Sequence, residues 1–166
     1  KQGLDCDIIL TSGGVSVGDY DLVKDVLAKM GANIRFWKVA MRPGKPLVFG
    51  TIKGIPVFGL PGNPVSSMVS FEVFVRPAIL KMLGQKDGSR KEAEAVLERD
   101  IEKKKGLRYF IRANTRWQQR KFVADITGSQ GSAVLKSMAL ANSLIILPEE
   151  DEHIQKGRKV AVRFLS

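Results

Sequence analysis

The sequence has very few of the residues that form cross-links or hold transition metals. It contains one cysteine, Cys6, and one histidine, His153, among 166 residues. A disulfide within the chain is therefore excluded, and so is a zinc site built from several cysteines. No apolar run reaches the roughly 18 residues that a membrane helix requires. These absences favour a reducing, cytoplasmic setting with no membrane partner.

Acidic residues are also fewer than basic ones. The chain has 27 lysines and arginines against 17 aspartates and glutamates, a formal net charge of +10 with a pI near 9.9. Such a surplus suits a nucleic acid, a phosphorylated small molecule or an oxyanion as ligand. A lysine-rich solvated surface explains it equally well. Charge alone does not choose among these ligands.

Proline is nearly absent from the second half of the chain, which indicates a boundary between two domains. Six of the seven prolines precede residue 84, and only Pro148 follows it. The short polar segment 84–89 predicts a linker. We therefore expect one domain over residues 1–83 and another over residues 90–166.

Residues 1–83 alternate strand-like and helix-like segments. Short apolar runs predict strands at residues 7–11, 34–39, 47–50 and 55–59. Helical spacing predicts helices over 21–30 and 64–83. This order predicts an α/β layer fold with a largely parallel sheet. Because so few strands leave one sheet edge uncovered, we expect the C-terminal piece of a larger protein.

In residues 90–166 the apolar residues are spaced as in a series of short strands, unlike the alternating strands and helices of residues 1–83. Short strand-like runs occur at 95–101, 107–113, 121–126, 144–147 and 159–164, and one short helix is predicted over 132–140. Turn residues separate most of these runs. The pattern predicts a small all-β, barrel-like domain.

The first candidate binding loop, TSGGVSVGDYD at residues 11–21, joins a predicted strand to a predicted helix. Glycines let backbone N–H groups approach an anion, and Ser12 and Ser16 add hydroxyl donors. Asp19 and Asp21 would repel an anion unless Mg²⁺ lay between carboxylate and phosphate. Alternatively, Asp21 is simply the N-cap of the next helix.

Two further loops follow predicted strands. MRPGKP, at residues 41–46, centres on Pro-Gly, which favours a type II turn that projects Arg42 and Lys45. GLPGNPVSS, at residues 59–67, places Asn63 and Pro64 at a helix start. Three such loops at one rim of a sheet would form a binding cleft. An exposed turn and a helix cap are the alternative explanations of the second and third.

A basic stretch lies in the second half of the chain. Residues 103–121 hold eight basic residues, no acidic ones and interleaved aromatics. Strand alternation places Arg108, Phe110 and Arg112 on one face and Tyr109 on the other. Basic strands with aromatics can stack bases and hold phosphates. A barrel hairpin with one solvated face is the alternative.

Taken together, the three loops resemble those of the MoeA family of molybdopterin molybdenumtransferases, which includes the E domain of gephyrin. The later segments FIRAN, TGSQGSAVLKSMALAN and LIILPE resemble the small C-terminal β domain of that family. The resemblance implies insertion of molybdate into adenylylated molybdopterin, assisted by Mg²⁺, with release of AMP. It also implies that residues 1–83 form the C-terminal half of a three-layer α/β molybdopterin-binding domain. We therefore expect a fragment that is inactive alone, from a homodimeric protein that binds no nucleic acid.

The resemblance also implies roles for individual residues. Asp21 corresponds to the functional carboxylate of the family's first loop and, with Asp19, to the Mg²⁺ ligands. Lys45 and Arg42 correspond to the cations near molybdate and the phosphates, although the family often has lysine where Arg42 stands. No protein nucleophile is required. This suits a sequence without a Ser/His/Asp set.

The β domain supplies the other implied anion contacts. Arg112 resembles the family's anion-binding arginine, and either Ser132 or Ser137 resembles the serine beside it. The remaining expected ligand-binding residues are Ser12, Gly13, Gly14, Ser16, Pro61, Asn63, Pro64 and Ser66. A non-catalytic pterin-binding or scaffold module, and a basic nucleic-acid-binding domain, are the alternative functions.

Overall fold

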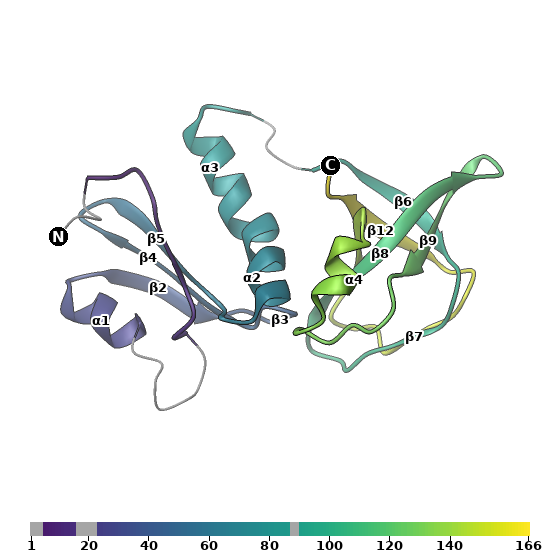
Figure 1. Cartoon of the computed structure of the whole chain (residues 1–166), viewed down its shortest axis with the longest axis horizontal. Helices are drawn as coiled ribbons and strands as arrows, with labels where there is room; N and C mark the ends of the chain where they lie inside the picture. The colour runs from purple at the N-terminus through teal and green to yellow at the C-terminus, as the bar shows by residue number, and fades with distance from the viewer. Residues whose placement is uncertain (1–4, 16–22, 87–89) are drawn as a thin grey trace. The chain divides into compact units, whose positions relative to one another are not determined.

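Two separate sheets organise the chain, whose computed structural model describes residues 5–15, 23–86 and 90–166 (Figure 1). One unit comprises residues 1–39 and 44–84, and the other comprises residues 40–43 and 85–166. The segment Ala40–Pro43 is therefore grouped with the second unit, although the residues on both sides of it belong to the first. No sequence pattern predicted that residues 40–43 would group with the second unit.

The first unit is built on a four-stranded sheet of order β1-β5-β4-β2. Its strands are β1 (Ile9–Ser12), β5 (Ile55–Leu60), β4 (Pro46–Ile52) and β2 (Asn33–Lys38). Only β1 and β5 pair in parallel, whereas β4 pairs antiparallel with both β5 and β2. The prediction of a largely parallel sheet is therefore wrong.

A two-residue turn explains that error. Lys53 and Gly54, between β4 and β5, have φ angles of 50° and 85°. Two consecutive positive φ angles are typical of the tight hairpin turns whose twist matches that of the flanking strands. Such a short connection can join only antiparallel strands.

Helices cover both faces of this sheet, as Figure 1 shows. On one face, Leu27 of α1 (Val23–Lys29) packs with Val48 and Val57 of the strands. On the other, α2 (Pro64–Ser70), the π-helical turn η2 (Phe71–Val75) and α3 (Arg76–Met82) bury Val75 against Leu47. The predicted three-layer α/β arrangement is confirmed.

A proline marks the irregular turn within the long helix. The helical run predicted over residues 64–83 is present, but its hydrogen-bond pattern widens over Phe71–Val75, directly before Pro77. Proline has no N–H to donate and its ring crowds the preceding turn. A widened turn is one way to accommodate it. The irregular turn therefore lies directly before the residue that disturbs the regular helix.

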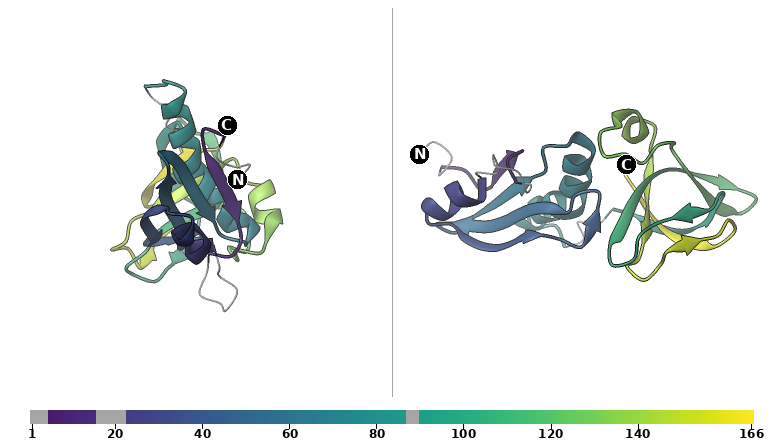
Figure 2. Two further views of the ribbon diagram at one scale, coloured as in Figure 1. Left: turned by 90° about the vertical axis from the view of Figure 1, so that its left-hand side faces the viewer. Right: turned by 90° about the horizontal axis from the view of Figure 1, so that it is seen from below.

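The second unit is a small barrel. Its strands are β6 (Glu92–Leu97), β8 (Arg108–Gln118), β9 (Lys121–Ile126), β10 (Ser143–Leu147) and β12 (Lys159–Phe164). They pair in the order β10-β12-β6-β9-β8, and β10 also pairs with β8, so the ring of strands closes. Figure 2 shows these strands curving around one core. The predicted barrel-like domain is confirmed.

Four smaller elements complete this unit. The short strand β3 (Met41–Arg42) adds to the start of β8 in parallel. The strands β7 (Ile101–Glu102) and β11 (His153–Ile154) form a separate two-stranded ribbon, and α4 is a single turn over Leu135–Ala139. No helix in the described ranges is long and apolar enough to span a membrane.

Alternation along β8 decides what faces the barrel core. Tyr109, Ile111 and Ala113 belong to the buried cluster, together with Ile145 and Leu147 of β10. Arg112 lies on the opposite face of β8, as the predicted alternation requires. That face is not solvated at Arg112, whose side chain is buried as well.

Two neighbouring residues of β10 provide a test of this core. Ile145 is fully buried in the barrel, whereas Ile146 points to the other face and is half-buried. We expect Ile145→Ala to lower the free energy of unfolding by about 2–5 kcal/mol, through lost burial and the cavity left behind. The control Ile146→Ala should cost clearly less. Urea denaturation of both variants checks this, and equal losses would contradict the assigned register.

Candidate functional site

The first and third candidate loops lie side by side at one edge of the first unit's sheet. Because β1 and β5 are parallel neighbours, their carboxyl ends share that edge. The Gly13 N–H donates to the Leu60 carbonyl at 3.0 Å. A Cβ placed on Gly62 would lie 3.2 Å from the Gly13 Cα, so glycine permits this close approach. Ser12 is exposed at the same edge, and Gly14 is half-buried.

Much of the first loop lies outside the described residues. This applies to Ser16, Asp19 and Asp21, and hence to the predicted Mg²⁺ ligands. Within the described ranges, no cluster of three or more His, Cys, Asp or Glu residues could hold a metal ion. The assignment of Asp19 and Asp21 as Mg²⁺ ligands therefore stays a prediction.

The third loop combines a helix start with an unpaired amide oxygen. Asn63 has the extended backbone of an N-cap, and Pro64 occupies the first turn of α2, as predicted. The Asn63 side chain makes no capping bond, and its Oδ1 is buried without a partner among the described residues. Helix capping therefore does not account for this side chain. Pro61 and Ser66 are also buried.

The second loop divides between the two units. Gly44 has a φ of 100°, in the region that glycine favours. The exposed residue Lys45 belongs to the first unit, where its carbonyl accepts from the Val39 N–H at 3.0 Å. Arg42 belongs to the second unit, as part of β3. The sequence placed both cations on one turn, and the structure groups only Arg42 with the barrel.

A cavity of about 760 Å³ lies within the second unit. Its lining includes Arg42, Lys103, Tyr109, Arg112 and Gln130. The Arg42 guanidinium carbon lies 5.6 Å from the centre of the Tyr109 ring, within the range of a cation–π contact. Its Nη1 also lies 3.5 Å from the Tyr109 hydroxyl oxygen. Arg42 and the buried Arg112 therefore both line this cavity, which is also lined by the acidic residues Asp100, Glu102 and Glu152.

Arg112 is the largest fully buried side chain described in the structure, with 1% of its surface exposed. Its Nε donates to Ser137 Oγ at 3.1 Å, and Nη2 donates to the carbonyls of Gly131 and Ser129 at 3.0 and 3.4 Å. Nη1 has no acceptor among the described residues. All of the partners are neutral.

The charge of Arg112 is consequently uncompensated. Burial lowers the pKa of the Arg112 guanidinium, and no neighbouring carboxylate in the described ranges raises it. Arginine nevertheless stays protonated in proteins. A buried charge is costly unless it is paired with an opposite one. An anion in the cavity, bound at Nη1, would supply that pairing.

The structure distinguishes the two candidate serines. Ser137 is buried in α4 beside Arg112, and its hydroxyl also donates to the Val134 carbonyl at 2.7 Å. Ser132 precedes α4 and has no recorded contact with Arg112. Sequence reasoning could not separate them, because each lies within reach of a short helix whose start was uncertain.

Lys103 shows how a buried cation is otherwise satisfied. Its Nζ donates to the carbonyls of Asp151, Pro148 and Glu149 at 2.6, 2.8 and 3.3 Å. It also lies 5.1 Å from the centre of the Tyr109 ring. All three of its N–H donors have acceptors, so this residue stabilises the loop 148–151 rather than offering a ligand contact.

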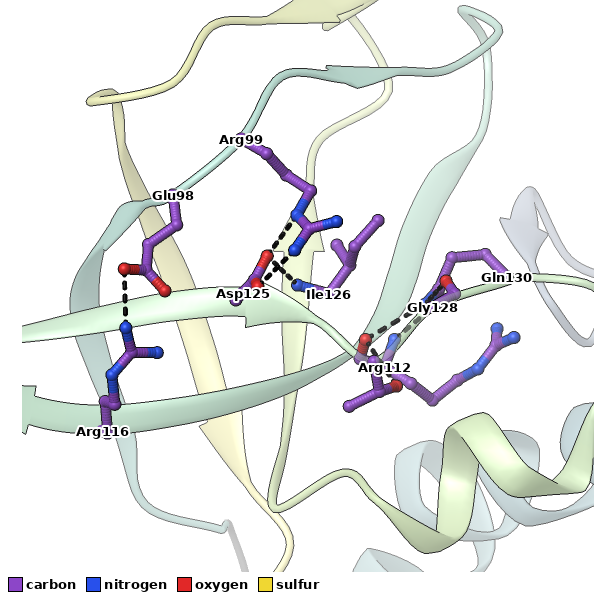
Figure 3. A network of polar contacts seen from close by, with 9 residues as sticks. Glu98, Arg99, Arg112, Arg116, Asp125, Ile126, Gly128 and Gln130 are labelled. Atoms are coloured by element: carbon purple, nitrogen blue, oxygen red, sulfur yellow. Dashed lines mark hydrogen bonds and ion pairs between the residues drawn. The ribbon is translucent and has the colours of Figure 1, made fainter.

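Three of the six other basic residues of the stretch 103–121 form ion pairs. Arg108 bonds Glu149 at 3.2 Å, Lys105 bonds Glu152 at 3.2 Å, and Arg116 bonds Glu98 at 2.7 Å. The last pair is visible in Figure 3, beside the ion pair of Arg99 with Asp125. Lys103 and Arg112 are buried, and Lys104, Arg120 and Lys121 are exposed outside these ion pairs. That this stretch binds no nucleic acid stays a prediction.

Family models match both units. The model of a probable molybdopterin binding domain covers residues 1–81, and that of the MoeA C-terminal region, domain IV, covers residues 94–165. The chain belongs to the MoeA family. The resemblance inferred from the five motifs is thus confirmed.

Individual relatives point to the same family. Molybdopterin molybdenumtransferase 2 of Mycobacterium tuberculosis is 38% identical, over 98% of this chain and 41% of its own length. The molybdopterin molybdenumtransferase of Bacillus subtilis is 40% identical, over 94% and 36%. Gephyrin of Dictyostelium discoideum is 40% identical, over 95% and 26%. The chain therefore spans about two fifths or less of the length of these curated relatives.

Solved structures show the same fold. The molybdopterin biosynthesis MoeA protein of Pyrococcus horikoshii OT3 matches with a TM-score of 0.71 and 28% identity, over 96% of this chain and 35% of that one. A molybdenum cofactor biosynthesis protein of Pyrococcus furiosus matches with a TM-score of 0.73 and 28% identity, over 96% and 49%. Both are named for molybdopterin or molybdenum cofactor biosynthesis.

The three hydrogen bonds of Lys103 Nζ lead to a prediction about the stability of the barrel. We expect Lys103→Met to lower the free energy of unfolding by about 1–3 kcal/mol, because three carbonyl acceptors lose their donor. The control Lys104→Met removes an exposed neighbour and should change stability by no more than about 0.5 kcal/mol. Chemical denaturation measures both. Unchanged stability of Lys103→Met would show that water replaces the ammonium at no cost.

Proposed function

We propose that this chain carries the molybdate-binding part of a molybdopterin molybdenumtransferase. The observation that carries the proposal is the buried Arg112 guanidinium, which faces the barrel cavity with Nη1 free of described partners and with no carboxylate beside it. Molybdate is a compact tetrahedral dianion. Planar N–H donors and a hydroxyl suit its oxygens.

Within this proposal each residue has a different role in binding the anion. Arg112 Nη1 would donate to one oxyanion oxygen, and the Ser137 hydroxyl holds the guanidinium plane through Nε. Arg42, placed against Tyr109, adds a second positive charge to the lining of the same cavity. These two cations would favour an anion over neutral solutes, against the opposing charges of Asp100, Glu102 and Glu152 in that lining.

The transfer step needs no covalent nucleophile from the protein. Adenylylated molybdopterin carries a phosphoanhydride. Water, or an oxygen of molybdate, would add to the adenylate phosphorus, the P–O bond to the pterin phosphate would break, and AMP would leave. The two dithiolene sulfurs would replace molybdate oxygens, which leave as hydroxide or water or pass to AMP. Lys45 and Arg42 would stabilise the charge that develops on the leaving phosphate. The loop glycines Gly13 and Gly14, with the Ser12 hydroxyl, suit the pterin phosphate by donating hydrogen bonds.

The family resemblance assigns Asp21 and Asp19 to Mg²⁺, and Ser16 and Ser66 to the pterin ligand. Asp21, Asp19 and Ser16 lie outside the described residues. Mg²⁺ supplies charge neutralisation at a phosphoanhydride. We retain these assignments as part of the proposal and base no step on them. Asn63, Pro61 and Pro64 would shape the wall of the pterin subsite.

The complete reaction belongs, in this proposal, to a protein of the relatives' full length. We expect this chain alone to bind molybdate without turnover, and we expect the full-length protein to be a cytoplasmic homodimer. A non-catalytic pterin-binding module is the second candidate function. It would bind the same ligands, and a full-length protein of that kind would release no AMP.

The decisive variant is Arg112→Met, which removes the charge and keeps the length of the side chain. Because hydrogen bonds to charged groups contribute about 1.5–3 kcal/mol, we expect molybdate affinity to fall by roughly 10- to 100-fold. In the full-length protein, molybdate-dependent AMP release should fall in parallel at low molybdate. Titration calorimetry and an AMP assay measure the two effects.

Arg116→Met is the matched control. Arg116 lies on the same strand, β8, but is exposed and paired with Glu98. The Arg116→Met variant should bind molybdate with the same affinity as the unchanged protein. If Arg112→Met also retained full affinity with an intact fold, the proposed anion site would be refuted.

A further inference from the structure

The side chain of Gln130 bridges back to the strand that carries Arg112. Its Oε1 accepts from the Arg112 backbone N–H at 3.0 Å, and its Nε2 donates to the Arg112 carbonyl at 3.2 Å. Figure 3 shows the amide lying against the Arg112 backbone. Nε2 also donates to the Gly128 carbonyl at 3.1 Å. One side chain thus satisfies both backbone groups of Arg112 and fixes its own loop.

The Gln130 side chain replaces a backbone hydrogen bond at the point where the pairing of β8 with β9 ends. The last ladder residue of β9 is Ile126, paired with Ala113, and Thr127 still donates its N–H to the Arg112 carbonyl at 3.0 Å. A continuing strand would then accept from the Arg112 N–H through its own backbone. Gln130 Oε1 accepts instead. The amide therefore lets β9 turn away without leaving a buried N–H unpaired.

The loop fixed in this way contains the acceptors of the Arg112 side chain. The carbonyls that accept from Nη2 belong to Ser129 and Gly131, the residues on both sides of Gln130. Gly128, with a φ of 90°, gives the loop a turn that other residues rarely adopt. Loops of glycine and serine are flexible unless they are tied down. Gln130 joins this loop to the backbone of Arg112, and the Thr127 hydroxyl, directly before the loop, lies 3.2 Å from the same Arg112 carbonyl.

We infer that Gln130 is a positioning residue for the anion site, an inference that rests on the proposed function. By locking residues 128–131 onto the Arg112 backbone, it holds two carbonyls where they bind Nη2. These carbonyls and Ser137 Oγ then fix the guanidinium plane, so that Nη1 is directed at the cavity. Gln130 acts through Arg112 and needs no contact of its own with the ligand. Outer contacts of this kind typically change ligand affinity by about 10- to 100-fold.

The test compares Gln130→Leu with Gln118→Leu in the chain described here. Leucine keeps the approximate volume and removes both bonds, and Gln118 is an exposed glutamine of β8. The first readout is the affinity for sodium molybdate by titration calorimetry. The second, independent of any ligand, is hydrogen exchange at the Arg112 Nε–H, followed by ¹⁵N–¹H NMR and assigned by its loss in Arg112→Met.

We expect Gln130→Leu to weaken molybdate binding about tenfold and to speed Nε–H exchange by a similar factor, with amide shifts outside residues 112 and 127–137 unchanged. Gln118→Leu should match the unchanged protein in both. Wild-type affinity together with wild-type exchange in Gln130→Leu would overturn the inference. If the unchanged protein failed to bind molybdate, the proposed function would fail, and the exchange rates would still decide the role of Gln130.

A second variant covers the case in which Gln130→Leu does not fold. Gln130→Glu keeps the shape and the Oε1 acceptor, loses the Nε2 donor and adds a negative charge to the loop. We expect it to weaken molybdate binding at pH 7 by at least as much as Gln130→Leu. Affinity at pH 7 equal to that of the unchanged protein would overturn the inference.

Discussion

A positive charge buried without a counter-charge is the constraint around which the second unit is arranged. Arg112 is held by a serine hydroxyl and two backbone carbonyls, none of which carries a full negative charge. Such an arrangement costs stability, because removing an ion from water is only partly offset by neutral dipoles. An apolar residue of similar volume would fold more readily. The arrangement is understandable if the missing charge arrives with a ligand.

Comparison with Lys103 strengthens this interpretation. Both cations are almost fully buried, both come from the basic stretch of the sequence, and both line the same cavity. Lys103 has an acceptor for each of its N–H groups, whereas Arg112 has two N–H groups on Nη1 without one among the described residues. We therefore interpret Lys103 as a structural cation and propose Arg112 as the contact for an anionic ligand. Burial and charge alone would not have distinguished them.

Much of this could be predicted from the sequence, because it depends on local pattern. Alternation correctly placed Tyr109 and Arg112 on opposite faces of β8, and the structure shows that the Tyr109 face lines the barrel core. Asn63 and Pro64 correctly marked a helix start. The parallel sheet was mispredicted because the Lys53-Gly54 turn was overlooked, although two turn residues between apolar runs are a hairpin signal.

Other features depend on contacts between distant residues. The pairing of Arg42 with Tyr109 spans 67 positions, and that of Gln130 with Arg112 spans 18. Neither leaves a periodic signal in the sequence. The assignment of Ser137 rather than Ser132 likewise required the position of α4 against β8. Residues that position a site through others are the hardest to recognise from sequence, since their own chemistry is unremarkable.

Crystals of the chain soaked in sodium tungstate test the central claim most directly. Tungstate has the shape and charge of molybdate and gives a strong anomalous signal that locates the metal. The account predicts an anomalous peak in the barrel cavity, with an oxyanion oxygen within hydrogen-bond distance of Arg112 Nη1, and its loss in Arg112→Met crystals. A peak only at surface lysines, or an unchanged peak in the variant, would contradict it.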